Sequence, residues 1–242
     1  MRAKALNEAA SARPIIIPIT DSQRVSGLLQ TAAKGTSCYV VAHGAGAGMR
    51  HPFLAKVSDG LAARGMATLR YQFPYMEKGS PRPDSPDVAH QAVRAAVSAA
   101  SPLVSDLSLF AGGKSFGGRM TSQAQAESPL PGVRGLIFLG FPLHPPGKPS
   151  DERAKHLFEV NIPMLFLQGD RDEFAKLDLL RSLTDRLGSR ATLKLFPGAD
   201  HSFHVPARTG KKDAEVMAEV LDAIKEWTSA VLQTGPPGTT KG

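Results

Sequence analysis

Gly113-Lys114-Ser115-Phe116-Gly117 is the stretch of this 242-residue sequence that decides the fold. Its pattern, G-x-S-x-G, is that of the nucleophile elbow, a sharp turn from a strand into a helix with a serine at its tip. An apolar segment at 106–112 precedes the pentapeptide, and a segment suited to a helix follows at 118–126. The two glycines leave room for a strained backbone and for close packing of the helix. Together these neighbours predict Ser115 as a nucleophile held between a strand and a helix.

The same residues also resemble the end of a phosphate-binding loop, G-x-x-x-x-G-K-[ST]. That loop requires a glycine at position 108, where this chain has Ser108. It also follows the first strand of a nucleotide-binding fold, whereas this segment lies midway along the chain. Without the glycine the loop loses its turn geometry, so we reject the nucleotide-binding interpretation.

The composition predicts one domain rather than two. With 242 residues and 42% apolar residues, the chain is long enough to bury one large core. We expect a single domain at 14–232, with flexible ends at 1–13 and 233–242, which are polar or rich in Gly, Pro and Thr. No stretch approaches the ~18 apolar residues that cross a bilayer, and the N-terminus has no continuous apolar core. Cys38 has no cysteine partner, so these features together predict a cytoplasmic protein without a membrane partner.

The net charge of +7 raises the question of nucleic-acid binding. The 29 lysines and arginines are scattered, without a run of five or more. Aromatic residues of the kind that stack on bases are not interleaved with them. We therefore expect a solvated basic surface and no nucleic-acid partner. The sequence carries no signal for an oligomeric state.

Short apolar runs alternate with longer helical patterns along the chain. The predicted strands lie at 15–19, 25–30, 37–43, 66–71, 106–112, 133–140, 163–168 and 192–196. The predicted helices lie at 52–64, 87–100, 118–126, 176–187 and 213–230. This alternation is typical of an α/β fold with a mostly parallel, twisted sheet and helices on both faces. The first two predicted strands form an antiparallel pair, and the proline in the first of them indicates an edge strand. No segment of the chain is large enough to form a separate lid domain.

A serine hydroxyl needs a base within hydrogen-bond reach and a third group that orients the base. In one large group of hydrolases the order is Ser, then Asp or Glu, then His, each in a loop after a different strand. Here Asp170 and Asp172 follow the strand at 163–168, and His201 and His204 follow the strand at 192–196. The order and the positions at strand ends predict a catalytic triad with Ser115.

Five segments carry a resemblance to a known family. They are AHGAG at 42–46, RYQFPY at 70–75, GGKSFGGR at 112–119, QGDRD at 168–172 and ADHSF at 199–203. The chain resembles the α/β-hydrolases of the dienelactone-hydrolase-like group, and more narrowly the small hydrolases related to testis-expressed protein 30. Dienelactone hydrolases of this group carry a cysteine nucleophile, whose place Ser115 takes here. The family patterns G-x-x-D and D-H-S-F select Asp172 and His201 for the triad.

The resemblance implies a serine hydrolase that cleaves a small ester or thioester through an acyl-enzyme and needs no cofactor. The oxyanion hole would consist of the backbone N–H groups of Phe116 and Ala45. Five residues at strand ends are candidates for a substrate pocket: Phe73, Tyr75, Lys114, Phe141 and Leu143. For the four aromatic or apolar ones, packing in the core fits the sequence equally well. The remaining histidines show no metal-ligand spacing, so no metal is expected. The alternative hypothesis is a non-catalytic scaffold that keeps the fold and a vestigial site.

Overall fold

The structure is a computed structural model that describes residues 11–234. An open sheet of eight strands forms its centre, in the order β1-β2-β4-β3-β5-β6-β7-β8. The strands are β1 (Arg13–Pro18), β2 (Arg24–Gln30), β3 (Ser37–Ala42), β4 (Met66–Tyr71), β5 (Ser108–Lys114), β6 (Val133–Leu139), β7 (Met164–Gly169) and β8 (Ala191–Phe196). The α-helices are α1 (Pro52–Ala62), α2 (Pro74–Glu77), α3 (Pro86–Leu103), α4 (Phe116–Glu127), α5 (Leu177–Leu187) and α6 (Asp213–Gln233). Six strands run parallel, which confirms the predicted α/β class.

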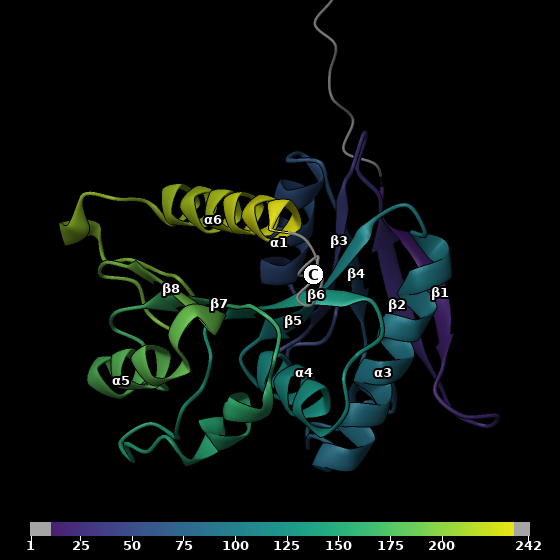
Figure 1. Cartoon of the computed structure of the whole chain (residues 1–242), viewed down its shortest axis with the longest axis horizontal. Helices are drawn as coiled ribbons and strands as arrows, with labels where there is room; N and C mark the ends of the chain where they lie inside the picture. The colour runs from purple at the N-terminus through teal and green to yellow at the C-terminus, as the bar shows by residue number, and fades with distance from the viewer. Residues whose placement is uncertain (1–10, 235–242) are drawn as a thin grey trace, which may run out of the picture.

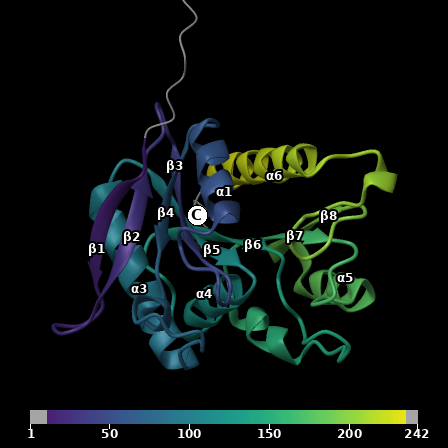
Figure 2. The same cartoon turned by 180° about the vertical axis from the view of Figure 1, so that it is seen from behind.

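Helices cover both faces of this sheet, with α1 and α6 side by side on one face and α3, α4 and α5 on the other (Figure 1). The view from behind shows the same grouping (Figure 2). Residues of β3 alternate between the two layers of core. Cys38, Val40 and Ala42 pack on the α3–α4 side, whereas Tyr39 and Val41 pack on the α1–α6 side. Because successive side chains of a strand point to opposite faces, a strand covered on both faces is apolar almost throughout.

The strand register brings the loops that follow the parallel strands to one edge of the sheet. Ala42 at the end of β3 is level with Tyr71 at the end of β4 and with Gly113 in β5. Lys114 at the end of β5 is level with Leu139 at the end of β6. Ligands of open α/β sheets bind at this edge. The segments after β3, β5, β7 and β8 therefore meet there, although they are far apart in the sequence.

The N-terminal strands β1 and β2 form the predicted antiparallel pair, and β1 is an edge strand. Pro18 ends β1, in keeping with the confinement of proline to strand ends and edges. The segment after β4 contains the four-residue α2, where the sequence pattern indicated no helix. Pro74 supplies a suitable φ at its first position, and the Tyr75 N–H donates to Asp84 Oδ2 (2.9 Å). The φ of Pro74 and the hydrogen bond to Asp84 explain why a helix forms here, although it is too short to show a periodic pattern.

The flexible ends expected at 1–13 and 233–242 lie mostly outside the described residues. Within the described part, β1 already begins at Arg13 and α6 ends at Gln233. A 3₁₀ helix, η1 (Glu152–Glu159), lies between β6 and β7, where the sequence pattern indicated no element. None of the helices in residues 11–234 has the length and apolar character needed to cross a bilayer.

Candidate active site

Ser115 occupies a strained turn between β5 and α4. Its φ is 48° and its ψ is −116°, and only three non-glycine residues among 11–234 have a positive φ. The Ser115 N–H donates to the Leu139 carbonyl (3.2 Å), which fixes the turn to β6. A Cβ at Gly117 would lie 2.5 Å from the His43 carbonyl oxygen, so α4 can pack here only with glycine. Such strain persists where the surrounding structure over-determines the backbone, and it is concentrated at functional sites.

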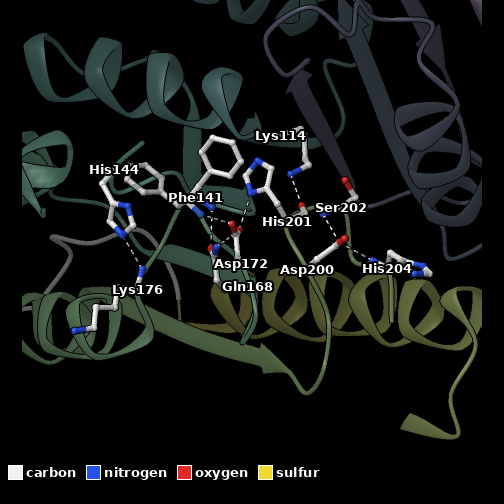
Figure 3. Close-up of polar contacts among 11 residues, drawn as sticks. Lys114, Phe141, His144, Gln168, Asp172, Lys176, Asp200, His201, Ser202 and His204 are labelled. Carbon is white, nitrogen blue, oxygen red and sulfur yellow. Dashed lines mark hydrogen bonds and ion pairs between the residues drawn. The ribbon is translucent and has the colours of Figure 1, made fainter. Parts of the chain in front are cut away.

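Asp172 lies in the loop after β7, and its carboxylate is fully buried. Oδ2 accepts hydrogen bonds from His201 Nδ1 (2.6 Å) and from Gln168 Nε2. Oδ1 accepts the N–H of Phe174 (2.8 Å). Figure 3 shows the carboxylate between the Gln168 and His201 side chains. Three donors offset the loss of water around the buried charge and hold the carboxylate in one orientation.

Gln168, at the end of β7, connects Asp172 to the loop after β6. While its Nε2 donates to Asp172, its Oε1 accepts the N–H of Phe141 (2.8 Å). The side chain is fully buried and uses both of its polar atoms. Sequence reasoning did not assign it a role. The available signal was a polar residue in a strand that is otherwise apolar and buried.

His201 follows β8 in a loop stabilised by its own hydrogen bonds. Asp200 Oδ1 accepts the N–H groups of Ser202 (2.7 Å) and His204 (3.0 Å). Because His201 Nδ1 faces the buried carboxylate, the proton is assigned to Nδ1 and Nε2 is left free to accept one. The imidazole packs against Phe174, with 4.5 Å between ring centroids. The loop and the ring contact together define the orientation of the imidazole.

The alternative acid and base occupy other positions. Asp170 is exposed, and its Oδ1 accepts an N–H of the loop after β8 (2.7 Å). His204 forms a surface ion pair with Asp213 (2.9 Å), and that hydrogen bond raises the pKa of His204. Of the four candidates, only Asp172 and His201 are bonded to each other.

A cavity of about 340 Å³ is lined by both Ser115 and His201. Its walls include the glycine-rich loop after β3, the first turn of α1 and Phe174. Within residues 11–234, no hydrogen bond joins Ser115 to His201. Hydrogen bonds between catalytic groups are often long in the free protein and tighten only when substrate is bound.

The glycine-rich loop after β3 is held by His43, which is fully buried. Its Nδ1 donates to the Gly44 carbonyl (2.8 Å), and its Nε2 accepts the N–H of Phe73 (3.1 Å). Burial lowers the pKa of His43 to about 4, so the imidazole is neutral at pH 7. Ala45 lines the cavity of Ser115. The Phe116 N–H is the first of α4, a position without an acceptor inside the helix.

Lys114 reaches from the elbow to the loop of His201 (Figure 3). Its Nζ donates to the His201 carbonyl oxygen at 2.6 Å. The same Nζ lies 5.9 Å from the ring centroid of Phe53 and 6.0 Å from that of Phe203. Burial lowers the pKa of Lys114 to about 8, although neighbouring carboxylates oppose this effect. Lys114 lines the cavity, but its ammonium group is bound to the backbone next to the candidate base.

Lys114 is also the only one of the five expected pocket residues that lines the cavity of Ser115. Phe73, Phe141 and Leu143 are fully buried in the core beneath the site. Tyr75 is 2% exposed, and its hydroxyl accepts an N–H of the glycine-rich loop (3.1 Å). These four side chains therefore lie in the core, which is one of the two positions that the sequence allowed. The loops after β4 and β6 turn their apolar side chains into the core rather than over Ser115.

Metal binding and thiol catalysis would require other side chains among the described residues. Within 11–234, no group of three or more His, Cys, Asp or Glu side chains is placed to hold a metal ion. Cys38 is buried in β3, where burial raises the pKa of its thiol to about 12. A thiol in that environment does not form the reactive thiolate.

Comparison with known proteins agrees with this architecture. A family model described as an alpha/beta hydrolase domain matches residues 35–229. A dienelactone hydrolase from Anabaena variabilis is 19% identical, with a TM-score of 0.73 over 92% of this chain and 99% of that one. An α/β serine hydrolase without a lid from Xanthomonas campestris is 18% identical, with a TM-score of 0.69 over 95% and 97%. Est1E from Butyrivibrio proteoclasticus is 17% identical, with a TM-score of 0.69 over 93% and 100%. The structural neighbours support the fold, the family model covers most of the chain, and the chain therefore belongs to the α/β-hydrolase family.

Proposed function

We propose that this α/β-hydrolase is a serine hydrolase that cleaves a small ester or thioester. The observation that carries the proposal is the 2.6 Å hydrogen bond from His201 Nδ1 to Asp172 Oδ2, beside a cavity that Ser115 also lines. A histidine oriented in this way by a buried carboxylate can accept a proton from a serine hydroxyl. Neighbours named as an esterase domain and a dienelactone hydrolase are consistent with ester cleavage.

In the proposed reaction, Ser115 Oγ attacks the carbonyl carbon of the ester. His201 Nε2 takes the serine proton and then gives it to the leaving alcohol or thiol, while the ester is converted to an acyl-enzyme. Asp172 keeps the imidazole in the required tautomer and stabilises it when it is protonated. Water then attacks the acyl-enzyme, with His201 as the base, and the acid product is released.

The tetrahedral intermediates carry a negative oxygen that needs two donors. We assign this role to the N–H groups of Phe116 and Ala45, each of which contributes about 10²–10³ in rate in comparable sites. Phe116 directly follows the nucleophile, and Ala45 borders the same cavity. The neutral, buried His43 would hold the loop of Ala45 in place through its two hydrogen bonds.

The narrower relationship, to the small hydrolases related to testis-expressed protein 30, remains part of this proposal. So do a small-molecule substrate, catalysis without a cofactor and a cytoplasmic location. The non-catalytic scaffold is not favoured, because a vestigial site has no need of a buried carboxylate bonded to a histidine beside a strained serine.

A fluorophosphonate probe tests the proposal directly. It should form a covalent adduct with the wild-type protein, and peptide mass spectrometry should locate the adduct on Ser115. The adduct requires an activated serine, so boiling the protein first should abolish it. If the folded protein does not react, the scaffold becomes the better explanation.

Lys114→Met should lower kcat/KM about ten- to hundred-fold for neutral and carboxylated esters alike. The reason is that Lys114 Nζ holds the backbone of His201, and small displacements of a catalytic group cost rates of this order. Lys114→Arg, which keeps a donor, should retain more activity than Lys114→Met. A loss confined to carboxylated esters would instead make Lys114 a binding group for an anionic substrate.

A further inference from the structure

A second cavity, of about 500 Å³, lies between α1 and α6 and adjoins the cavity of Ser115. The two cavities share three lining residues: His51, Phe53 and Ser202. The two cavities therefore border the same three side chains, and a ligand bound at Ser115 has to pass only these to reach the second cavity. We propose that this groove binds the acyl chain of the substrate, so that the enzyme prefers esters with an extended apolar acyl group. The inference rests on the proposed function and names its substrate class.

The floor of the groove is apolar. Phe53 and Phe203 stack there at 6.0 Å between ring centroids, with an interplanar angle of 12°. From α6, Met217 and the buried Leu221 complete the apolar lining. Phe203 is 2% exposed, so its ring has a fixed position beneath the groove. A chain of methylene groups would remove apolar surface from water along this floor, which favours binding.

The face of α6 that lines the groove also provides space. Ala214, Ala218 and Leu221 follow the three- and four-residue spacing that places side chains on one side of a helix. The two alanines leave the groove open where larger side chains would fill it. From Ala214 to Leu221 the helix rises about 10 Å, a length suited to a medium-length acyl chain. Figure 1 shows α1 and α6 next to each other on one face of the sheet.

The charged residues at the rim do not oppose a neutral chain. Arg64 is bonded to Asp222 at 2.7 Å, and Asp213 is bonded to His204 at 2.9 Å. Lys56 is exposed, and a lysine can keep its ammonium group in water while its methylenes cover an apolar ligand. An acyl chain would therefore bury no uncompensated charge.

The other side of His201 suits the leaving group better. A cavity of about 450 Å³ lies there and shares His201 and Phe174 with the cavity of Ser115. Its lining includes the charged residues Arg171, Glu173 and Arg208. The leaving group receives its proton from His201, so we assign it to the part of the site next to this ring, which the charged cavity also borders. The apolar groove is thus left to the acyl chain.

Chain-length dependence provides the test. Each methylene that becomes buried raises kcat/KM about four-fold, so p-nitrophenyl octanoate should exceed p-nitrophenyl acetate by about a hundred-fold or more in the wild type. Ala218→Trp would fill the groove and should lower kcat/KM for the octanoate at least about thirty-fold, while leaving the acetate within about three-fold. Ala214→Trp, at an exposed position on the same stripe, should act in the same direction if Ala218→Trp fails to fold. Ala230→Trp, on the exposed last part of α6 outside the groove, is the matched control and should change neither rate.

Two further comparisons make the outcome decisive. If the groove variants impair octyl acetate and spare ethyl octanoate, the groove binds the alcohol and the proposal is overturned. Equal rates for the two chain lengths in every variant would overturn it as well. Binding of dodecanoate to the Ser115→Ala protein, measured by calorimetry, needs no catalysis and should weaken about ten-fold or more in the Ala214→Trp background. If Ala214→Trp weakens dodecanoate binding but the wild type hydrolyses no ester, the serine hydrolase is refuted and the acyl groove is not. If the wild type hydrolyses esters but Ala214→Trp leaves dodecanoate binding unchanged, the acyl groove alone is refuted.

Discussion

Ser115→Ala should lower kcat/KM for a p-nitrophenyl ester by about 10⁴- to 10⁶-fold. The size of the effect follows from the chemistry: without Oγ no acyl-enzyme can form, and only transition-state binding by the remaining groups is left. The backbone of the elbow should be unaffected, since alanine keeps a Cβ and the bond from residue 115 to Leu139 uses only the N–H. Initial rates with purified protein, together with a thermal melt to show intact folding, provide the measurement.

Ser128→Ala is a suitable control for this experiment. Ser128 is exposed after the end of α4, lies outside the lining of both cavities, and bonds to Ala124 and Arg94 through backbone atoms. We therefore expect kcat/KM for Ser128→Ala to stay within about three-fold of the wild type. Retention of more than about one per cent of activity in Ser115→Ala would remove Ser115 from the role of nucleophile.

Asp172→Asn should lower kcat about 10⁴-fold while leaving KM nearly unchanged. An asparagine can present its amide N–H to His201, which would move the imidazole proton to Nε2 and block that atom as a base. The replacement also disturbs the bond from Gln168, because the amide carries one oxygen where the carboxylate carries two. The measurement is steady-state kinetics with a neutral ester over a range of pH.

The matched variant is Asp170→Asn, two residues earlier in the same loop. Asp170 is exposed and accepts only a loop N–H, so its loss should change kcat no more than about five-fold. The two variants together decide which carboxylate orients His201. A severe defect in Asp170→Asn with a mild one in Asp172→Asn would reverse the assignment.

Much of the fold could be predicted because its signals are local. Apolar runs and helical patterns predicted every strand of the sheet and all the long helices, with shifts of a few residues at their ends. The elbow and the loops of Asp172 and His201 could be placed because each follows a strand, and parallel strands end at one edge. The pairing of His201 with Asp172 rather than Asp170 came from the family pattern and agrees with the hydrogen bond.

The features that could not be predicted depend on contacts between distant segments. Gln168 joins two loops through a fully buried amide, and its place in an apolar strand marks it as unusual without indicating its partners. Apolar residues such as Phe141 and Leu143 occur in pocket walls and in cores alike. Only the path of the loop decides which of these two positions they take. Lys114 turns toward His201 past Gly140, where a Cβ would lie 3.0 Å from Nζ. Gly140, far away in the sequence, therefore helps to leave room for that side chain.

The positive φ of Ser115 has a consequence for protein engineering. A non-glycine residue in such a conformation costs about 1–3 kcal/mol, whereas glycine adopts it without a steric penalty. Directed evolution that selects only for heat resistance would therefore favour glycine at this position. The variant would melt at a higher temperature and would lack the hydroxyl. At the elbow, selection for robustness and selection for turnover act in opposite directions, so a screen for improved variants must score both properties.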